Sequence, residues 1–116
     1  MSGERSVIQR LHDICENAEF IQQTVSGVSA EEFFSDILYP AAVSLAFEII
    51  GEASKHVPHD LRSAYPQIPW DDNIAFADLL GHEYHKVSSQ DVWERAQSQI
   101  PALVDSVSAM IGDLEK

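Results

Sequence analysis

The 116-residue sequence is poor in three features, and each shortage excludes a class of protein. A single cysteine, Cys15, excludes an intramolecular disulfide framework and a cysteine-based structural zinc site. The 7 Lys and Arg residues stand against 19 Asp and Glu residues, so the formal net charge of −12 excludes a broad basic surface, although not a local positive site. The most apolar stretch, residues 37–50, contains Pro40, Ser44 and Glu48, which a membrane-spanning helix does not favour.

The beginning of the sequence shows no targeting signal. Residues 2–5 are polar or charged, and no long apolar run follows them. Hydrophobic residues make up 45% of the sequence, which is typical of globular proteins and too many for a disordered acidic tail. We therefore expect a soluble cytoplasmic protein with one domain over residues 1–116 and no contact with a membrane.

Apolar residues recur every three or four positions along most of the chain, which is the pattern of helices with one buried face. No alternating pattern predicts a strand. Helices are predicted over about residues 5–26, 29–56, 71–81 and 88–111, with a short additional helix over residues 59–65. The connections are short, so neighbouring helices should be antiparallel. The predicted fold class is all-α, an up-and-down bundle of four to five helices.

Glycine, proline and serine mark the predicted ends of these helices. Gly27 and Gly81 are expected to stop the helices that precede them. Pro40 should kink or divide the second region, and Pro101 should bend the last one, because proline lacks the N–H donor and crowds the preceding turn. Capping signals are predicted at Ser29 and Ser88.

The densest group of reactive side chains is the segment 81–86, directly after the third predicted helix. A histidine such as His82 can accept or donate a proton near neutral pH, Tyr84 offers a hydroxyl that can be modified, and Lys86 offers a charge for a phosphate. Another interpretation is a solvated helix end whose side chains cap carbonyls. A metal site is a third, with the candidate ligands His82, Glu83 and His85 and the second pair His56 and His59, but no His-Glu-x-x-His signature supports it.

Two acidic residues, Glu48 and Glu52, lie four positions apart and therefore on one side of the second helical region. If one of them is partly buried, it is a candidate for positioning a catalytic arginine or histidine. The alternative is an ordinary exposed pair near Lys55. Small residues in the same region permit another helix to approach closely, either within the chain or across a dimer: Ala42, Ala46, Gly51 and Ala53.

Four blocks of the sequence carry a family resemblance: Leu45–Ser54, Tyr65–Trp70, Leu79–Tyr84 and Asp91–Glu94. In their order and spacing they resemble the HepT-like branch of the HEPN-domain toxins. The resemblance implies a compact HEPN-like helical bundle, a homodimer, and a metal-independent endoribonuclease that needs no cofactor. It also implies the toxin role in a type VII-like toxin–antitoxin system, with RNA as substrate and a minimal nucleotidyltransferase as the antitoxin partner.

The active motif of the family is Arg, four residues, His, one residue, Tyr. The resemblance assigns the histidine to His82 and the tyrosine to Tyr84, while the arginine position falls on Ala77. Asp78 matches the polar residue that commonly follows the arginine. In the family chemistry the histidine shuttles a proton and the arginine stabilises the charge of the phosphorane, which alanine cannot do. The chain is therefore expected to be an inactive or weakened ribonuclease.

Position 77 raises a geometric question as well. On a regular helix, positions 77 and 82 point about 140° apart, so they meet around one phosphate only if the helix ends between them or a second protomer contributes. Nothing in the spacing brings Arg62 or Arg95 to the vacant position. Natural loss of the arginine and deliberate replacement to permit production of a toxic protein both explain Ala77.

The resemblance further assigns Tyr84 as the residue to which the antitoxin transfers AMP. The alternative is that Tyr84 only holds the loop through a hydrogen bond. For the whole chain, the alternative functions are a non-catalytic dimeric module that binds a nucleotidyltransferase partner and a generic nucleotide-binding bundle.

Overall fold

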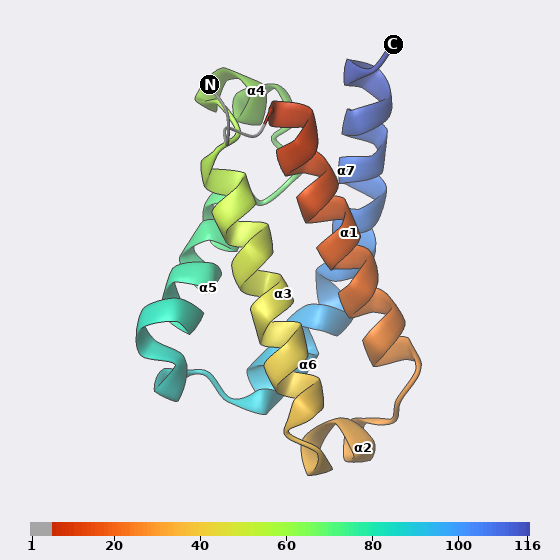
Figure 1. Ribbon diagram of the computed structural model, residues 1–116, viewed down its shortest axis with the longest axis vertical. Helices are drawn as coiled ribbons and strands as arrows, with labels where there is room; N and C mark the ends of the chain where they lie inside the picture. The colour runs from red at the N-terminus through yellow and green to blue at the C-terminus, as the bar shows by residue number, and fades with distance from the viewer. Residues whose placement is uncertain (1–5) are drawn as a thin grey trace.

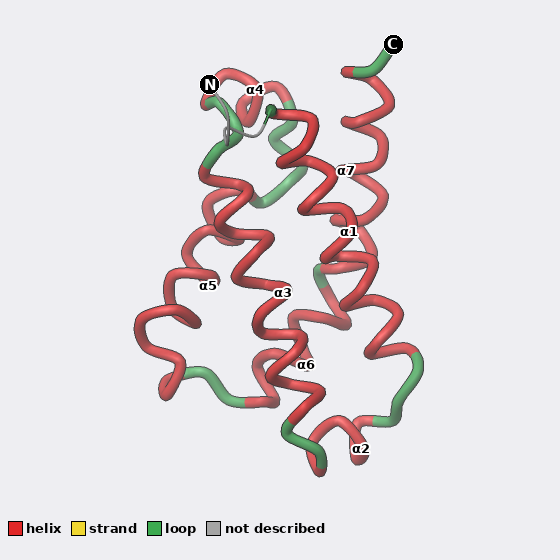
Figure 2. Tube along the Cα trace, in the orientation of Figure 1, coloured by secondary structure: helices red, strands yellow, loops and turns green. Residues whose placement is uncertain are grey.

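The structure is a computed structural model that describes residues 6–116, and these residues form helices and no β-strand (Figure 2). The elements are α1 (Val7–Ser26), α2 (Ala30–Ser35), α3 (Leu38–Lys55), α4 (His59–Ala64), α5 (Trp70–Glu83), the 3₁₀-helix η1 (Tyr84–Lys86), α6 (Ser89–Ser98) and α7 (Ile100–Leu114). The prediction of an all-α fold is confirmed.

Four helices stand side by side and alternate in direction (Figure 1). Helix α3 packs between α1 and α5, and α1 packs in turn against α7. In the view of Figure 1, α1 and α5 run downward while α3 and α7 run upward, with α2 and α6 below and α4 above. This arrangement is the predicted antiparallel bundle.

Much of the core lies where α1 packs against α3 on one side and α7 on the other. Its fully buried side chains are mostly aliphatic: Leu11, Ile14, Ile21, Val43, Ile50, Ile100, Val107 and Met110. Full burial of one such side chain contributes roughly 1.5–3 kcal/mol relative to exposure. Helix α3, which packs on α1, is in turn the element against which α5 is held.

The structure divides two of the predicted helical regions. Helix α2 ends at Ser35 and α3 begins at Leu38, so the division falls just before Pro40, which occupies the first turn of α3. A proline is tolerated there because the first N–H groups of a helix have no helical acceptor. The last region is divided between Ser98 and Ile100 rather than bent, and Pro101 is again in the first turn of the new helix.

The predicted helix end at Gly81 is wrong, because α5 continues to Glu83. Gly81 instead lies inside the last turn of α5, close to a side chain of α3. A Cβ atom added there would lie 3.4 Å from the Glu48 Oε1 atom. The predicted end at Gly27 is confirmed, since Gly27 is the C-cap of α1.

The predicted capping serines are confirmed. The Ser29 hydroxyl accepts a hydrogen bond from the Glu32 N–H at 3.1 Å, and the Ser88 hydroxyl accepts one from the Asp91 N–H at 3.1 Å. In both cases the acidic side chain accepts a hydrogen bond from the serine N–H in return. The cap at Ser88 fixes the start of α6 directly after η1 and so limits where that turn lies.

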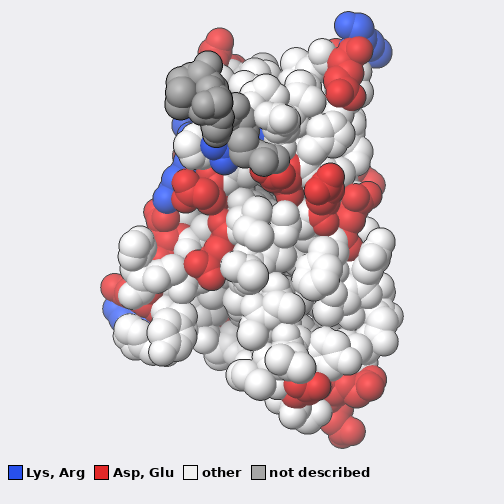
Figure 3. Space-filling view, viewed as in Figure 1, with Lys and Arg blue, Asp and Glu red and all other residues white. Residues whose placement is uncertain are grey.

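An apolar strip remains exposed along α1 and α3. Phe20, Leu45 and Ile49 are 43%, 58% and 37% exposed and line a shallow groove together with Ala42. Figure 3 shows few charged side chains across the lower centre of this face, over α1 and α3. In residues 6–116, no helix combines the length and apolar character that crossing a membrane would require.

Candidate functional site

The predicted histidine and tyrosine lie at the lower end of α5 (Figure 1). His82 is exposed in the last turn of α5, and Tyr84 is 74% exposed as the first residue of η1. The Val87 N–H donates to the Tyr84 carbonyl at 3.0 Å and closes the turn. An imidazole and a phenol are thus presented to solvent two residues apart, where a large substrate or a partner protein can reach both.

Glu48 borders the same end of α5 from α3. It is half-buried, which is the condition that the sequence analysis set for a positioning role, and it lines a concavity with Tyr84, Ser44 and Leu80. The close approach of Gly81 to its carboxylate brings Glu48 beside the last turn of α5.

Ala77 lies away from these exposed groups. It is 8% exposed and packs against Gly51 of α3, where an added Cβ would collide with the Ala77 side chain and lie 2.7 Å from the Asn73 carbonyl oxygen. Gly51 therefore supports close packing of α3 on α5 within the chain, one of the two alternatives that the sequence left open. An arginine at position 77 would have to leave the helix along this packed contact.

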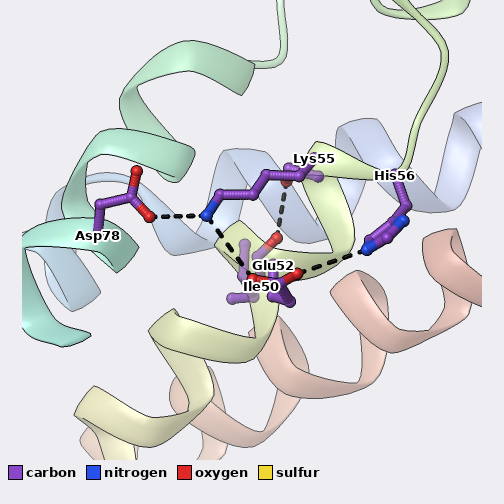
Figure 4. A network of polar contacts seen from close by, with 6 residues as sticks. Ile50, Glu52, Lys55, His56 and Asp78 are labelled. Carbon is purple, nitrogen blue, oxygen red and sulfur yellow. Dashed lines mark hydrogen bonds and ion pairs between the residues drawn. The ribbon is translucent and has the colours of Figure 1, made fainter.

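Asp78 and Glu52 take part in a different contact, a surface network that joins α3 to α5 (Figure 4). The Lys55 ammonium donates a hydrogen bond to Asp78 Oδ1 at 2.8 Å and lies 3.7 Å from Glu52 Oε1. Glu52 Oε2 lies 3.4 Å from His56 Nε2. The hydrogen bond to Asp78 is the main cause that raises the pKa of Lys55. Glu52 is thus the exposed member of the glutamate pair, with Lys55 beside it, as the second interpretation expected.

The regular geometry of α5 decides which of its side chains lie on the same side of the helix. Because the helix is continuous from Trp70 to Glu83, it does not end between Ala77 and His82, and their side chains leave it about 140° apart. Asp78 and His82 are four residues apart and differ by only about 40°. The Lys55 contact and His82 are therefore on the same side of α5.

The candidate metal ligands of segment 81–86 do not converge. Within residues 6–116, no group of three His, Cys, Asp or Glu side chains is arranged to hold a metal ion. Glu83 instead lies 3.0 Å from the Lys86 ammonium. Lys86, which the sequence analysis considered as a charge for a phosphate, is thus paired with a carboxylate in its own turn.

The structure brings His82, Tyr84 and Glu48 to one end of the α3–α5 pair, and Asp78 and Glu52 to the network beside it, while Ala77 is buried between the helices. Sequence reasoning placed Lys55 near Glu52 but missed its contact with Asp78. The pair Glu52 and Lys55 is visible from helical spacing. The contact with Asp78 depends on how α3 and α5 align, which the sequence pattern does not specify.

Comparison with known proteins shows the family to which the chain is similar. The profile of the family described as "Ribonuclease HepT-like" matches residues 14–110. The chain is 37% identical over 100 residues to a protein of Thermococcus cleftensis named "Probable ribonuclease HepT", covering 86% of this chain and 91% of that protein. It is 34% identical over 112 residues to a "Putative RNase" of Methanocaldococcus jannaschii, covering 97% and 93%. No solved structure gave a significant match.

The fold and the site together define a class of protein. It is a helical bundle that exposes a histidine and a tyrosine at the end of one helix. The chain belongs to the HepT-like ribonuclease family. Membership supports a ribonuclease-type function by resemblance, with RNA as the class of substrate.

Proposed function

We propose that this chain is the ribonuclease toxin of a type VII-like toxin–antitoxin pair, formed by one HEPN-like domain over residues 1–116, and that it cleaves RNA without a metal ion. The observation that carries the proposal is the exposure of His82 and Tyr84 at the end of α5, at the motif spacing, in a chain of this family. Because Ala77 occupies the arginine position, cleavage by this chain is weak.

The chemistry requires few groups. The RNA 2′-hydroxyl attacks the adjacent phosphorus, a new O–P bond forms, and the bond from phosphorus to the 5′-oxygen breaks. His82 shuttles the proton between these oxygens. The products are a 2′,3′-cyclic phosphate and a free 5′-hydroxyl, and the acceleration depends on how well the charge on phosphorus is stabilised.

The missing arginine explains the low activity. Loss of one charge-stabilising donor typically lowers the rate by about 10² to 10³. An arginine side chain at position 77 would follow the contact with Gly51 to the surface, where Glu48 and Glu52 lie along the same stretch of α3. Their carboxylates are suited to orient a guanidinium, which is the supporting role that we propose for them.

The test is the Ala77→Arg variant, compared with Ala77→Met as a control of similar length without charge. Ala77→Arg is expected to cleave RNA about 10² to 10³ faster than the parent chain, in the presence of EDTA, and Ala77→Met is not. Adding His82→Ala to Ala77→Arg should abolish the gain. A folded Ala77→Arg protein that cleaves no RNA and is harmless when expressed would remove the main support for the proposal.

We also propose that the chain forms a homodimer in which the Tyr84 segments of the two protomers border a shared groove. The exposed strip with Phe20, Leu45 and Ile49 supports this proposal, because a contiguous apolar surface is typical of an interface. A dimer also enlarges the surface that one small bundle offers to RNA. Sedimentation is expected to give a dimer at micromolar concentration, and a monomer there would contradict the proposal.

Regulation through Tyr84 completes the proposed function. The exposed Tyr84 hydroxyl is available to a nucleotidyltransferase antitoxin that transfers AMP from ATP, releasing pyrophosphate. The attached phosphodiester adds bulk and roughly one negative charge where an RNA phosphate must bind. Incubation with the cognate antitoxin and ATP should raise the mass by AMP units that map to Tyr84. An unchanged mass, or adducts that persist in Tyr84→Phe, would contradict this role.

The second candidate, a non-catalytic dimeric module for the same nucleotidyltransferase, is favoured by the alanine at position 77. One outcome of the Ala77→Arg experiment distinguishes this candidate from the ribonuclease. If Ala77→Arg folds, dimerises and binds the antitoxin but cleaves no RNA, the binding role is the function that remains.

A further inference from the structure

With alanine at position 77, a phosphate bound at His82 has to take its positive charge from another residue. Ala77 is buried under α3 and points about 140° away from His82. Asp78 lies one turn before His82 on its own side, at a distance that helical geometry sets to about 5–6 Å between Cβ atoms. The group bound to Asp78 is therefore the nearest candidate for a second phosphate contact within one protomer.

The cationic side chains around α5 differ in whether they reach the side of the helix on which His82 lies. Arg95 is held by Asp72 near the start of α5, and Arg62 lies beside Asp71 in the same first turn. Lys86 pairs with Glu83 inside its own turn. Lys55 alone, among these four, extends from α3 to Asp78 and so to the side of His82 (Figure 4).

We infer that Lys55 supplies the phosphate-binding cation of the weakened site, by exchanging its hydrogen bond with Asp78 for one to a phosphate oxygen of RNA bound at His82. The inference rests on the proposed ribonuclease function. It makes Lys55, on α3, a partial substitute for the arginine that Ala77 replaces.

The contacts of Lys55 permit such an exchange. The side chains of Lys55 and Asp78 are 39% and 48% exposed, and one hydrogen bond of 2.8 Å joins them. Exposed ion pairs of this kind contribute little to stability, so breaking one costs little. The ammonium remains charged at neutral pH, and its flexible stem lets it turn to a phosphate.

The same contacts explain why Lys55 replaces the missing arginine only in part. Asp78 and Glu52 both lie beside the ammonium, so two carboxylates compete with a phosphate for one cation. Removing the charge of Asp78 should release Lys55 for RNA, while removing Lys55 should leave two carboxylates that repel RNA. The two changes are therefore expected to act in opposite directions.

This opposition separates a phosphate-binding role from a structural one. If the ion pair merely held α3 against α5, loss of either partner would have the same effect. The variants to compare are Asp78→Asn and Lys55→Met, each with a control of equal charge change at an exposed position away from the site. The controls are Glu16→Gln and Lys116→Met.

The first readout is affinity for a single-stranded 2′-O-methyl oligonucleotide, which cannot be cleaved, and the second is single-turnover cleavage of the matching RNA. Lys55→Met should weaken binding and lower any cleavage at least about 10-fold, Lys55→Arg should preserve both, and Asp78→Asn should strengthen binding several-fold. The two controls should change binding less than about 2-fold, because their charges are distant and screened. Circular dichroism verifies that each variant folds.

The inference is overturned if Lys55→Met binds like Lys116→Met, or if Asp78→Asn weakens binding as Lys55→Met does. The Ala77→Arg variant and its His82→Ala derivative are measured beside them. Cleavage by Ala77→Arg that depends on His82, with no effect of Lys55 on binding, contradicts the inference alone. A folded Ala77→Arg protein without cleavage contradicts the ribonuclease proposal itself.

Discussion

Two of the cations that pair with aspartates of helix α5 are Arg95 of α6 and Lys55 of α3, and their ion pairs are built differently. Arg95 donates to both oxygens of Asp72, at 2.8 and 3.4 Å, and to the Gln99 side chain at 3.2 Å. Its guanidinium also lies 4.0 Å from the centre of the Phe76 ring, and its side chain is 28% exposed. By contrast, Lys55 makes one hydrogen bond to Asp78 and is more exposed.

The difference shows which cation is structural and which is available to a ligand. A guanidinium held by a carboxylate, an amide and a ring at once would lose several contacts on turning to a phosphate. An ammonium with one hydrogen bond to an exposed carboxylate, and a second carboxylate 3.7 Å away, loses less. Arg95 therefore fastens α6 to the start of α5, whereas Lys55 can exchange partners near the other end of that helix.

The largest effect is expected where α3 touches α5 most closely. Gly51→Ala would introduce a Cβ that collides with Ala77 and lies 2.7 Å from the Asn73 carbonyl oxygen, so α3 and α5 must separate. We expect a loss of about 1–3 kcal/mol in the free energy of unfolding, measured by urea denaturation. The contact between Lys55 and Asp78 should be lost together with this packing, while that between Arg95 and Asp72 remains.

Gly112→Ala is the matched control for this change. Gly112 is helical in α7, and a Cβ added there would meet nothing within 4 Å. Replacing it should be neutral or stabilise the protein by up to about 0.5 kcal/mol, because alanine favours the helix. Equal destabilisation by the two variants would show that the close contact at Gly51 is not what holds α5 in place.

The second largest expected effect distinguishes the structural ion pair from the exchangeable one. Arg95→Met should lower the free energy of unfolding by about 1–2 kcal/mol, since it removes hydrogen bonds to a carboxylate and the contact with Phe76. Lys55→Met should leave it almost unchanged, as exposed substitutions usually do. Urea denaturation of both variants at one pH provides the comparison. A larger loss for Lys55→Met would reverse our assignment of the structural pair.

The smallest effect concerns alkaline pH. The hydrogen bond with Asp78 raises the pKa of Lys55, so the folded state binds this proton more tightly than the unfolded state does. The resulting stabilisation is complete below the unfolded pKa and is lost as the pH rises through the folded pKa, above about pH 10. Lys55→Met should reduce this loss slightly, which urea midpoints at pH 7 and about pH 11 can measure.

Tyr65 contributes in the same direction and must be controlled. Its pKa is raised by burial and by its hydrogen bond to Asp113 at 3.1 Å, so its ionisation also removes stability at alkaline pH. Tyr65→Phe should reduce the alkaline loss independently of Lys55→Met. If neither variant alters the loss between the two pH values, the ion pair and the tyrosine contact are not the groups responsible.

Much of the fold could be predicted because helix signals are local. The period of the apolar residues and the caps at Ser29 and Ser88 depend on residues within one or two turns, and the structure confirms them. The end at Gly81 was wrong because α5 continues through this glycine to Glu83. The sequence pattern does not distinguish a glycine that ends a helix from one that lies inside it.

The sequence proposes the residues of the candidate site but does not predict how they are arranged. The spacing of His82 and Tyr84 is a property of one segment, and both lie exposed at the end of α5. The burial of Ala77 and the link from Lys55 to Asp78 depend on how α3 lies along α5, which the Gly51 contact sets. No local pattern encodes that alignment.

The most direct test of the account is an NMR titration of the chain with the 2′-O-methyl oligonucleotide, in which side-chain signals of Lys55, His82 and Arg95 are followed together. The account predicts that Lys55 and His82 shift along one saturation curve while Arg95 does not move. Saturation that shifts His82 but leaves the Lys55 signal unchanged, or that shifts Arg95 instead, would contradict it.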